Sequence, residues 1–127
     1  MRILVADVPR MDARYNAALE GWEIAFVRTM GEARQALAVA RHDLVAIGVY
    51  FDDSRMFDLI RALRADRAHG KMPIVCVRGR PGFTAVSSRT LALSLHELGV
   101  DEFIDLLDSD DDAARAAFRG AIERLKG

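Results

Sequence analysis

The chain has 127 residues, of which 51% are hydrophobic, and its 18 basic and 19 acidic residues give a net charge of −1. This length and composition predict one globular domain over residues 1–127, and the balanced charge provides no general attraction to nucleic acid or to an anionic membrane. The chain opens directly on a strand pattern without a signal peptide, and no apolar run approaches the about 18 residues that span a bilayer. We therefore expect a cytoplasmic protein that binds neither nucleic acid nor membrane.

Short apolar strands and amphipathic helices alternate along the whole chain. Strands are expected at the apolar runs 3–6, 22–27, 44–49, 73–77 and 103–104. Residues typical of helix starts follow these strands, namely Pro9, Thr29 with Glu32, Ser87 or Ser88, and Ser109 or Asp110. The strict alternation predicts an α/β protein with a flavodoxin-like (βα)5 architecture, in which a doubly wound parallel five-stranded sheet forms the middle layer of a three-layer sandwich.

The segment 43–60 places a buried strand directly before a group of polar residues and a helix. Its apolar run 44–49 is typical of a parallel strand that is covered on both faces. Asp52, Asp53 and Ser54 supply turn and capping chemistry for the helix that follows. In doubly wound sheets functional groups lie beyond the carboxyl ends of the strands, so residues 48–54 should border any active site.

The cysteine and the histidines form no metal-site pattern. Cys76 is the only cysteine, which excludes an internal disulfide and a cysteine-based zinc site. Its apolar neighbours predict an inert thiol in the core. His42, His69 and His96 share no metal-ligand spacing, and we expect them on the surface or at helix ends.

Five segments resemble, in order and spacing, the response-regulator receiver (CheY-like) family of two-component signalling. These segments are RILVAD, DLVAIGV, FDLIRALR, MPIVCV and GVDEFI, and the resemblance covers essentially the whole chain. The family implies an aspartate acceptor at the end of the third strand and acidic residues after the first strand that hold Mg²⁺. It also implies a serine or threonine at the end of the fourth strand and a lysine after the fifth.

Carried onto this sequence, most of these functional positions hold other residues. The acceptor position falls on Gly48, the acidic pair on Asp7 and Val8, the hydroxyl on Arg78 and the lysine on Leu106. Only Asp7 keeps the residue type that the family requires. Glycine offers no nucleophile, and one carboxylate beside an arginine is a poor magnesium site, so we expect no cofactor.

Two placements are open for Arg78, which we expect in a loop over residues 78–82. Its guanidinium could pair with Asp7 in the strand-end crevice and replace the positive charge of both metal and lysine. Alternatively, the side chain could point to solvent from the loop.

The resemblance and the losses together favour an atypical receiver domain that is not an enzyme and acts as a phosphorylation-independent interaction module. Its expected partner is a histidine kinase, a regulator, an output protein or a second copy of the chain. We expect the interaction face to contain Leu91, Leu93, Leu95 and Phe103, with Leu93 off the buried helical stripe and exposed.

Two other functions remain open from the sequence. In one, the phospho-acceptor is displaced to Asp52 or Asp53, a few residues beyond Gly48. In the other, the loop 78–82 binds a small ligand or anion through the charges of Arg78 and Arg80, with glycines that permit close approach.

Overall fold

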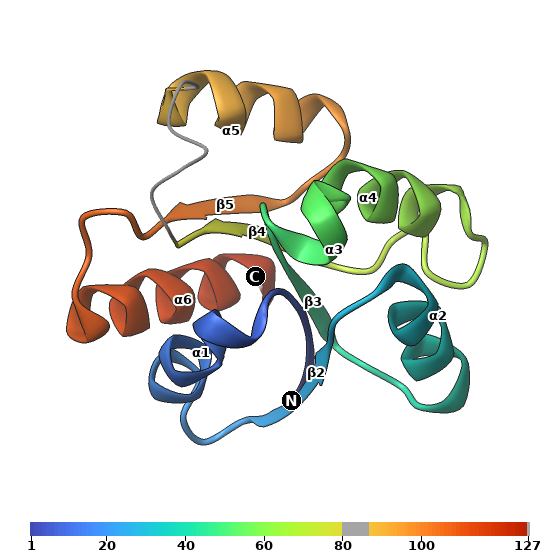
Figure 1. Cartoon of the computed structure of the whole chain (residues 1–127), viewed down its shortest axis with the longest axis horizontal. Helices are drawn as coiled ribbons and strands as arrows, with labels where there is room; N and C mark the ends of the chain where they lie inside the picture. The colour runs from blue at the N-terminus through green and yellow to red at the C-terminus, as the bar shows by residue number, and fades with distance from the viewer. Residues whose placement is uncertain (80–86, 127) are drawn as a thin grey trace.

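The computed structural model describes residues 1–79 and 87–126 of the chain. Five parallel strands form one sheet in the order β2-β1-β3-β4-β5, which confirms the predicted flavodoxin-like fold (Figure 1). The strands are β1 (Arg2–Ala6), β2 (Glu23–Val27), β3 (Leu44–Gly48), β4 (Ile74–Arg78) and β5 (Glu102–Asp105). The predicted strand positions are thus confirmed to within one residue at each end; for example, Val49 follows β3 and Arg78 belongs to β4.

Helices cover both faces of the sheet and complete the three layers. They are η1 (Pro9–Met11), α1 (Asp12–Ala18), α2 (Met30–Val39), α3 (Phe51–Ser54), α4 (Met56–Ala65), α5 (Ser88–Glu97) and α6 (Asp111–Lys126). Helices α1 and α6 lie together on one face, whereas α2, α4 and α5 cover the other (Figure 1). No helix in the described part of the chain is both long and apolar enough to cross a membrane.

The continuous apolar strands are explained by two cores, one on each face of the sheet. Along β3, Val45 and Ile47 pack into the core beneath α2, α4 and α5, while Leu44 and Ala46 face α1 and α6. Successive side chains of a strand point to opposite faces, so a strand that is covered on both sides must be apolar at every position. Cys76 of β4 is fully buried, as predicted, and this burial raises the pKa of its thiol.

Side-chain caps at the helix starts match the sequence pattern and decide between its alternatives. The Thr29 hydroxyl accepts a hydrogen bond from the Glu32 amide at 3.1 Å, and the Ser87 hydroxyl accepts one from the Thr90 amide at 3.1 Å. Asp110, rather than Ser109, caps α6 by accepting from an amide of its first turn at 2.8 Å. Each such cap stabilises a helix by about 1 kcal/mol.

The predicted capping role of residues 52–54 is wrong. Asp52, Asp53 and Ser54 have φ angles of 46°, 55° and 65°, in the left-handed region, and α4 begins only at Met56 without a side-chain cap. Instead, the Asp52 carboxylate accepts a hydrogen bond from the Met30 amide at 2.9 Å, so it supports the start of α2. Aspartate and serine can serve here because short polar side chains tolerate this backbone region better than most others do.

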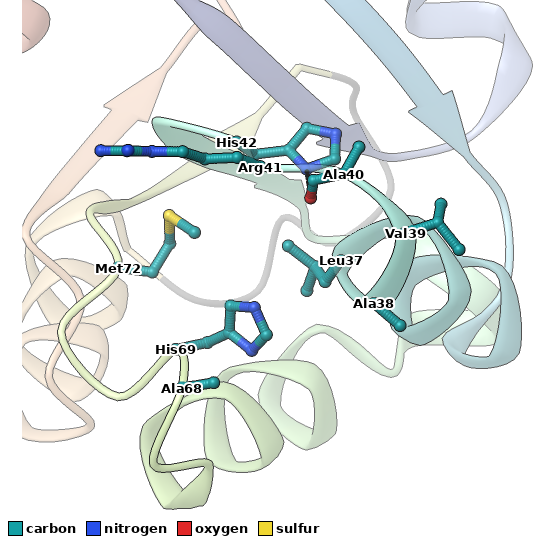
Figure 2. Close-up of a pocket in the computed structure, with 9 residues that line it drawn as sticks. All are labelled: Leu37, Ala38, Val39, Ala40, Arg41, His42, Ala68, His69 and Met72. Atoms are coloured by element: carbon teal, nitrogen blue, oxygen red, sulfur yellow. Dashed lines mark hydrogen bonds between the residues drawn. The ribbon is translucent and has the colours of Figure 1, made fainter.

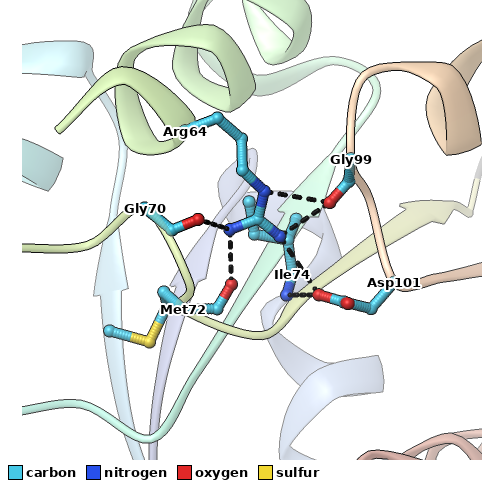
Figure 3. Close-up of polar contacts among 6 residues, drawn as sticks. All are labelled: Arg64, Gly70, Met72, Ile74, Gly99 and Asp101. Carbon is cyan, nitrogen blue, oxygen red and sulfur yellow. Dashed lines mark hydrogen bonds and ion pairs between the residues drawn. The ribbon is translucent and has the colours of Figure 1, made fainter. Parts of the chain in front are cut away.

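Arg64 lies near the amino-terminal ends of β4 and β5 and holds the loops there (Figure 3). Its guanidinium donates to the carbonyl oxygens of Gly70, Met72 and Gly99 at 2.7–3.1 Å and pairs with Asp101 at 3.1 Å. The same Asp101 oxygen accepts from the first amide of β4 at 2.8 Å. One arginine of α4 thereby holds the loops that lead into β4 and β5.

We expect the histidines on the surface or at helix ends, but His42, which follows the end of α2, is 4% exposed and therefore not a surface residue. Its Nδ1 lies 3.1 Å from the carbonyl oxygen of Ala40. Burial, together with the positive charge of Arg2, lowers the pKa of His42. The residue lies in the connection between α2 and β3. His69 is half-buried and His96 is exposed.

Candidate functional site

The carboxyl ends of β1, β3, β4 and β5 lie at one end of the sheet, the expected strand-end crevice, and Asp7 is the buried acidic group there. Asp7 follows β1 directly and is 3% exposed. Its two carboxylate oxygens accept hydrogen bonds from the Tyr15 hydroxyl at 2.6 Å and from the Val8 amide at 2.7 Å. Burial raises the pKa of Asp7, and these two hydrogen bonds only partly offset that effect.

Tyr15, whose role at this site the sequence did not reveal, is held in place by aromatic contacts. Its ring meets Phe118 of α6 edge-on at 5.9 Å between centroids and Phe26 of β2 at 6.5 Å. Burial and the neighbouring Asp7 carboxylate raise the pKa of Tyr15 well above its usual value, so the hydroxyl stays a donor. The two side chains form a buried pair with a fixed geometry.

Gly48 lies against this pair. A Cβ atom at position 48 would lie 2.0 Å from the Asp7 carboxyl carbon and 2.0–2.2 Å from its two oxygens. Since no side chain can occupy that space while Asp7 is in place, the carboxyl group of Asp7 fills the position from which an acceptor at residue 48 would extend. Glycine therefore fits because it leaves room for its neighbour.

Both placements considered for Arg78 are wrong. Arg78 is the last residue of β4 rather than part of a loop, and it is 4% exposed. Its guanidinium pairs with the carboxylate of Asp105, the residue that faces it in the register of β4 and β5, and not with Asp7. Burial alone would raise the pKa of Asp105, but hydrogen bonds from Arg78 and the Leu107 amide hold that pKa below its usual value.

Leu106, at the position of the family's lysine, is buried and contributes backbone groups only. Its amide donates to the Arg78 carbonyl at 2.8 Å, and its carbonyl accepts from Arg14 at 3.3 Å. Arg14 of α1 also donates to the carbonyl oxygens of Gly79 at 3.4 Å and Ser109 at 2.6 Å. An arginine that the sequence did not single out thus joins the segments that follow β4 and β5.

Arg28, a further arginine that the sequence did not single out, lies beside Asp7 and next to β2. Arg28 forms a two-point ion pair with Asp12 of α1, at 2.8 and 2.5 Å, and donates to the backbone carbonyl of Asp7 at 3.1 Å. The hydrogen bonds to Asp12 raise the pKa of Arg28. Arg14, Arg28 and Arg78 are therefore all engaged in contacts within the domain at these strand ends.

The residues at the crevice do not suit Mg²⁺. Magnesium prefers octahedral coordination by oxygens, usually carboxylates with phosphate and water. Here Asp7 is the one acidic residue at the family's metal positions, and both of its oxygens accept hydrogen bonds from protein donors. Within residues 1–79 and 87–126, no three histidine, cysteine, aspartate or glutamate side chains gather as a metal-binding group.

The remaining predicted site residues lie apart from this crevice or differ in exposure. Asp52 is partly buried and bound to the Met30 amide, whereas Asp53 is exposed. Arg80 and Gly82, and most of the loop proposed to bind an anion, lie outside the described residues. Of the predicted interaction face, Leu93 is 59% exposed and Phe103 is half-buried. Leu91 and Leu95 are at most 2% exposed and pack in the core, so the prediction that they contact a partner is wrong.

Comparison with known proteins finds the same fold in solved structures of low sequence identity. No protein-family model matches the chain, and no curated protein sequence matches it significantly. A solved receiver domain of a signal transduction histidine kinase from Syntrophus aciditrophicus is 23% identical, with 98% of this chain and 92% of that chain covered and a TM-score of 0.73. A response regulator from Thermotoga maritima is 19% identical over 96% of this chain and 97% of its own, with a TM-score of 0.74.

NtrX from Brucella abortus gives a similar result for a longer protein. It is 22% identical over 98% of this chain, with a TM-score of 0.75, and the match spans 27% of the NtrX chain. Since the identities are low, what these proteins share with this chain is the fold. The chain has the flavodoxin-like fold of response-regulator receiver domains.

Proposed function

We propose that this chain is an atypical receiver domain of two-component-type signalling that binds a protein partner without phosphorylation of an aspartate. The observation that carries the proposal is the contact between Asp7 and Gly48. In a working receiver, a nucleophile must extend into the crevice beside the metal. Here that volume is filled by the Asp7 carboxyl group, which the Tyr15 hydroxyl holds at 2.6 Å.

The charges around the crevice support the same proposal. Phosphoryl transfer depends on cations that neutralise charge as it develops on the phosphoryl oxygens. The Arg78 guanidinium is buried against Asp105, and Arg14 is bound to backbone carbonyls. These cations already stabilise the domain itself, and using them for a phosphoryl group would break those contacts.

The surface that we propose for partner binding centres on Leu93 of α5. A large aliphatic side chain that is 59% exposed is a plausible anchor for a protein contact. Phe103 of β5 and the outer side of α6 extend this surface. The partner would be a histidine kinase, a regulator, an output protein or a second copy of the chain, and the domain would act by binding rather than by catalysis.

Intact-mass measurement after incubation with acetyl phosphate and Mg²⁺ tests the absence of phosphorylation. The expected result is an unchanged mass. For the binding surface, Leu93→Asp is compared with Ser94→Asp, which adds the same charge at the neighbouring exposed position. If the partner is a second copy, light scattering should show that Leu93→Asp alone abolishes self-association.

A displaced acceptor is a second candidate, and exposure favours Asp53 over Asp52. Asp53 follows β3 by five positions and is open to solvent, whereas the Asp52 carboxylate is bound to the Met30 amide. This candidate predicts that acetyl phosphate adds one phosphoryl group to the wild type and none to Asp53→Asn. That result would replace the proposal of phosphorylation-independent binding.

A further inference from the structure

A second surface with the features of a binding site lies between α2 and α4, away from Leu93 and the strand-end crevice. One cavity of about 450 Å³ lies between the end of α2 and the loop after α4, where Leu37, His69 and Met72 line it (Figure 2). An adjoining cavity of about 410 Å³ continues between the two helices. Because both cavities are lined by Leu37, Ala38 and His69, they form one continuous depression, which we call the α2–α4 groove.

The floor of the α2–α4 groove is aliphatic. Leu37 and Ala38 of α2 face Leu59, Ala62 and Leu63 of α4 across the second cavity. At the rim of the first cavity stands Val39, which at 68% is the most exposed large hydrophobic residue in the described part of the chain. Grooves of this kind between two helices accept the apolar face of a third helix, through side chains spaced three or four residues apart.

The rim of the groove is basic. Arg34 and Arg41 line it on the side of α2, and Arg67 and Lys71 lie in the loop that borders it on the other side. None of these four cations forms an ion pair or side-chain hydrogen bond with another described residue, whereas Arg64 nearby is fully engaged.

The one carboxylate that lines the groove does not balance these cations. Asp66 already accepts hydrogen bonds from the Ala68 amide and from His69 Nδ1, each at 2.9 Å. The groove therefore carries a local positive excess on a chain whose net charge is −1. A partner that fits it must bring carboxylates together with apolar side chains.

We propose that the α2–α4 groove binds an acidic amphipathic helix of a partner protein. The apolar face of that helix lies on Leu37, Ala38 and Ala62, which are at least partly exposed. Its carboxylates pair with Arg34 and Arg41 along one rim and with Arg67 and Lys71 along the other. Nucleic acid and anionic lipid headgroups match the charges but leave the aliphatic floor unfilled. Because this surface is separate from Leu93, the domain can hold two partners at once, and the proposal is independent of phosphorylation.

The test uses a phage-displayed library of helical peptides with one randomised face. Selection against the wild-type chain includes a counter-selection with Ala38→Gln, in which a longer neutral side chain fills the junction of the two cavities. The expected peptides carry Leu, Ile or Phe at helical spacing, flanked by Asp or Glu. Their binding shifts the amide resonances of Leu37, Leu63 and His69.

The role of the basic rim is tested by comparing charge reversal inside the groove with an equal charge reversal elsewhere on the surface. Arg34→Glu with Arg41→Glu should weaken binding of a selected peptide by about tenfold or more, and higher salt should weaken it further. Arg10→Glu with Arg89→Glu changes the net charge equally at exposed positions outside the groove and should change the affinity by less than about twofold. Thermal unfolding of all variants confirms that they are folded.

Several results would overturn this proposal. These are a selection without acidic peptides, peptide-induced shifts confined to α5 and β5, and equal effects of the two charge reversals. A concentration-dependent dimer that Ala38→Gln dissociates would identify a second copy as the occupant instead. Displacement of the peptide by duplex DNA or by phosphatidylserine vesicles, with shifts in the same groove, would identify a polyanion. Leu93→Asp should leave peptide binding unchanged, which separates a failure here from a failure of the proposed function.

Discussion

The carboxyl group of Asp7 occupies the space in front of Gly48, so that a Cβ at position 48 would lie 2.0 Å from the Asp7 carboxyl carbon. Asp7 directly follows β1 and Gly48 ends the neighbouring parallel strand β3, and the Tyr15 hydroxyl from α1 holds Asp7 in this contact. The absence of a side chain at position 48 and the placement of Asp7 are therefore coupled. Introducing an aspartate at position 48 would require Asp7 to leave its hydrogen bonds.

This contact predicts that Gly48→Ala destabilises the domain by about 1–3 kcal/mol, because an added methyl group overpacks a rigid site. Urea unfolding measures the difference in free energy. Gly31→Ala is the control, since a Cβ there meets only the Thr29 hydroxyl at 3.9 Å and alanine favours the helix. If Gly48→Ala is as harmless as Gly31→Ala, Asp7 moves freely and the crevice can accept a side chain at position 48.

The raised pKa of Asp7 predicts how the stability depends on pH. Because burial raises this pKa above its unfolded value of 3.8, the folded state binds more protons between the two values. The free energy of unfolding of the wild type, relative to Asp7→Asn, should therefore fall as pH rises from about 3.8 through the folded pKa. Urea unfolding of both proteins across this range measures the difference. A relative stability that rises with pH would mean that Asp7 is paired with a cation such as Arg78.

The partly buried pair of Arg78 and Asp105 predicts a loss of about 1–3 kcal/mol for Asp105→Asn, because the buried guanidinium loses the negative charge that faces it. Since the pKa of Asp105 is lowered, its contribution is present above about pH 4 and is lost as pH falls through the folded pKa. Asp58→Asn, which removes the partner of two exposed arginines, should cost less than about 0.5 kcal/mol. Equal losses in the two variants would show that burial does not strengthen the pair.

The left-handed turn at 52–54 predicts different effects on stability for two adjacent glycine substitutions. Asp53→Gly should stabilise the domain by about 0.5–1 kcal/mol, because glycine adopts positive φ without the cost that a Cβ brings. Asp52→Gly gains the same relief but loses the hydrogen bond to the Met30 amide, which is worth about 1 kcal/mol. Thermal unfolding should therefore rank Asp53→Gly above Asp52→Gly. The reverse order would mean that Asp52 does not support α2.

The fold could be predicted from the sequence because its signals are local and agree with one another. The apolar runs of β1, β3 and β4 and the caps Thr29 and Ser87 each fix an element, and their alternation leaves few topologies. The sequence alone does not distinguish the two possible roles of residues 52–54, because aspartate and serine are typical both of helix caps and of left-handed turns. Only the contact with Met30, which is distant in sequence, favours the second role.

The candidate site was predicted less well because its contacts are tertiary. Asp7 and Gly48 lie at the strand ends as expected, but both placements considered for Arg78 are wrong, because Arg78 ends β4 and pairs with Asp105. β4 extends one residue beyond the predicted strand and includes Arg78, which faces Asp105 in the parallel register of β4 and β5. A prediction of this register from the sequence could have revealed the ion pair. Tyr15 reads as an ordinary core residue, and its bond to Asp7 depends on how α1 packs against β1.

The proposal of phosphorylation-independent binding is tested most directly by NMR, with beryllofluoride and Mg²⁺ added to the isotopically labelled domain. Beryllofluoride mimics a phosphoryl group on an aspartate, so a working receiver responds both at its acceptor and at its output surface. We predict that the amide resonances of Asp7, Gly48 and Asp105, and those of Leu93 and Phe103, remain unchanged. Saturable shifts that begin near Gly48 or Asp53 and extend to Leu93 would contradict the proposal.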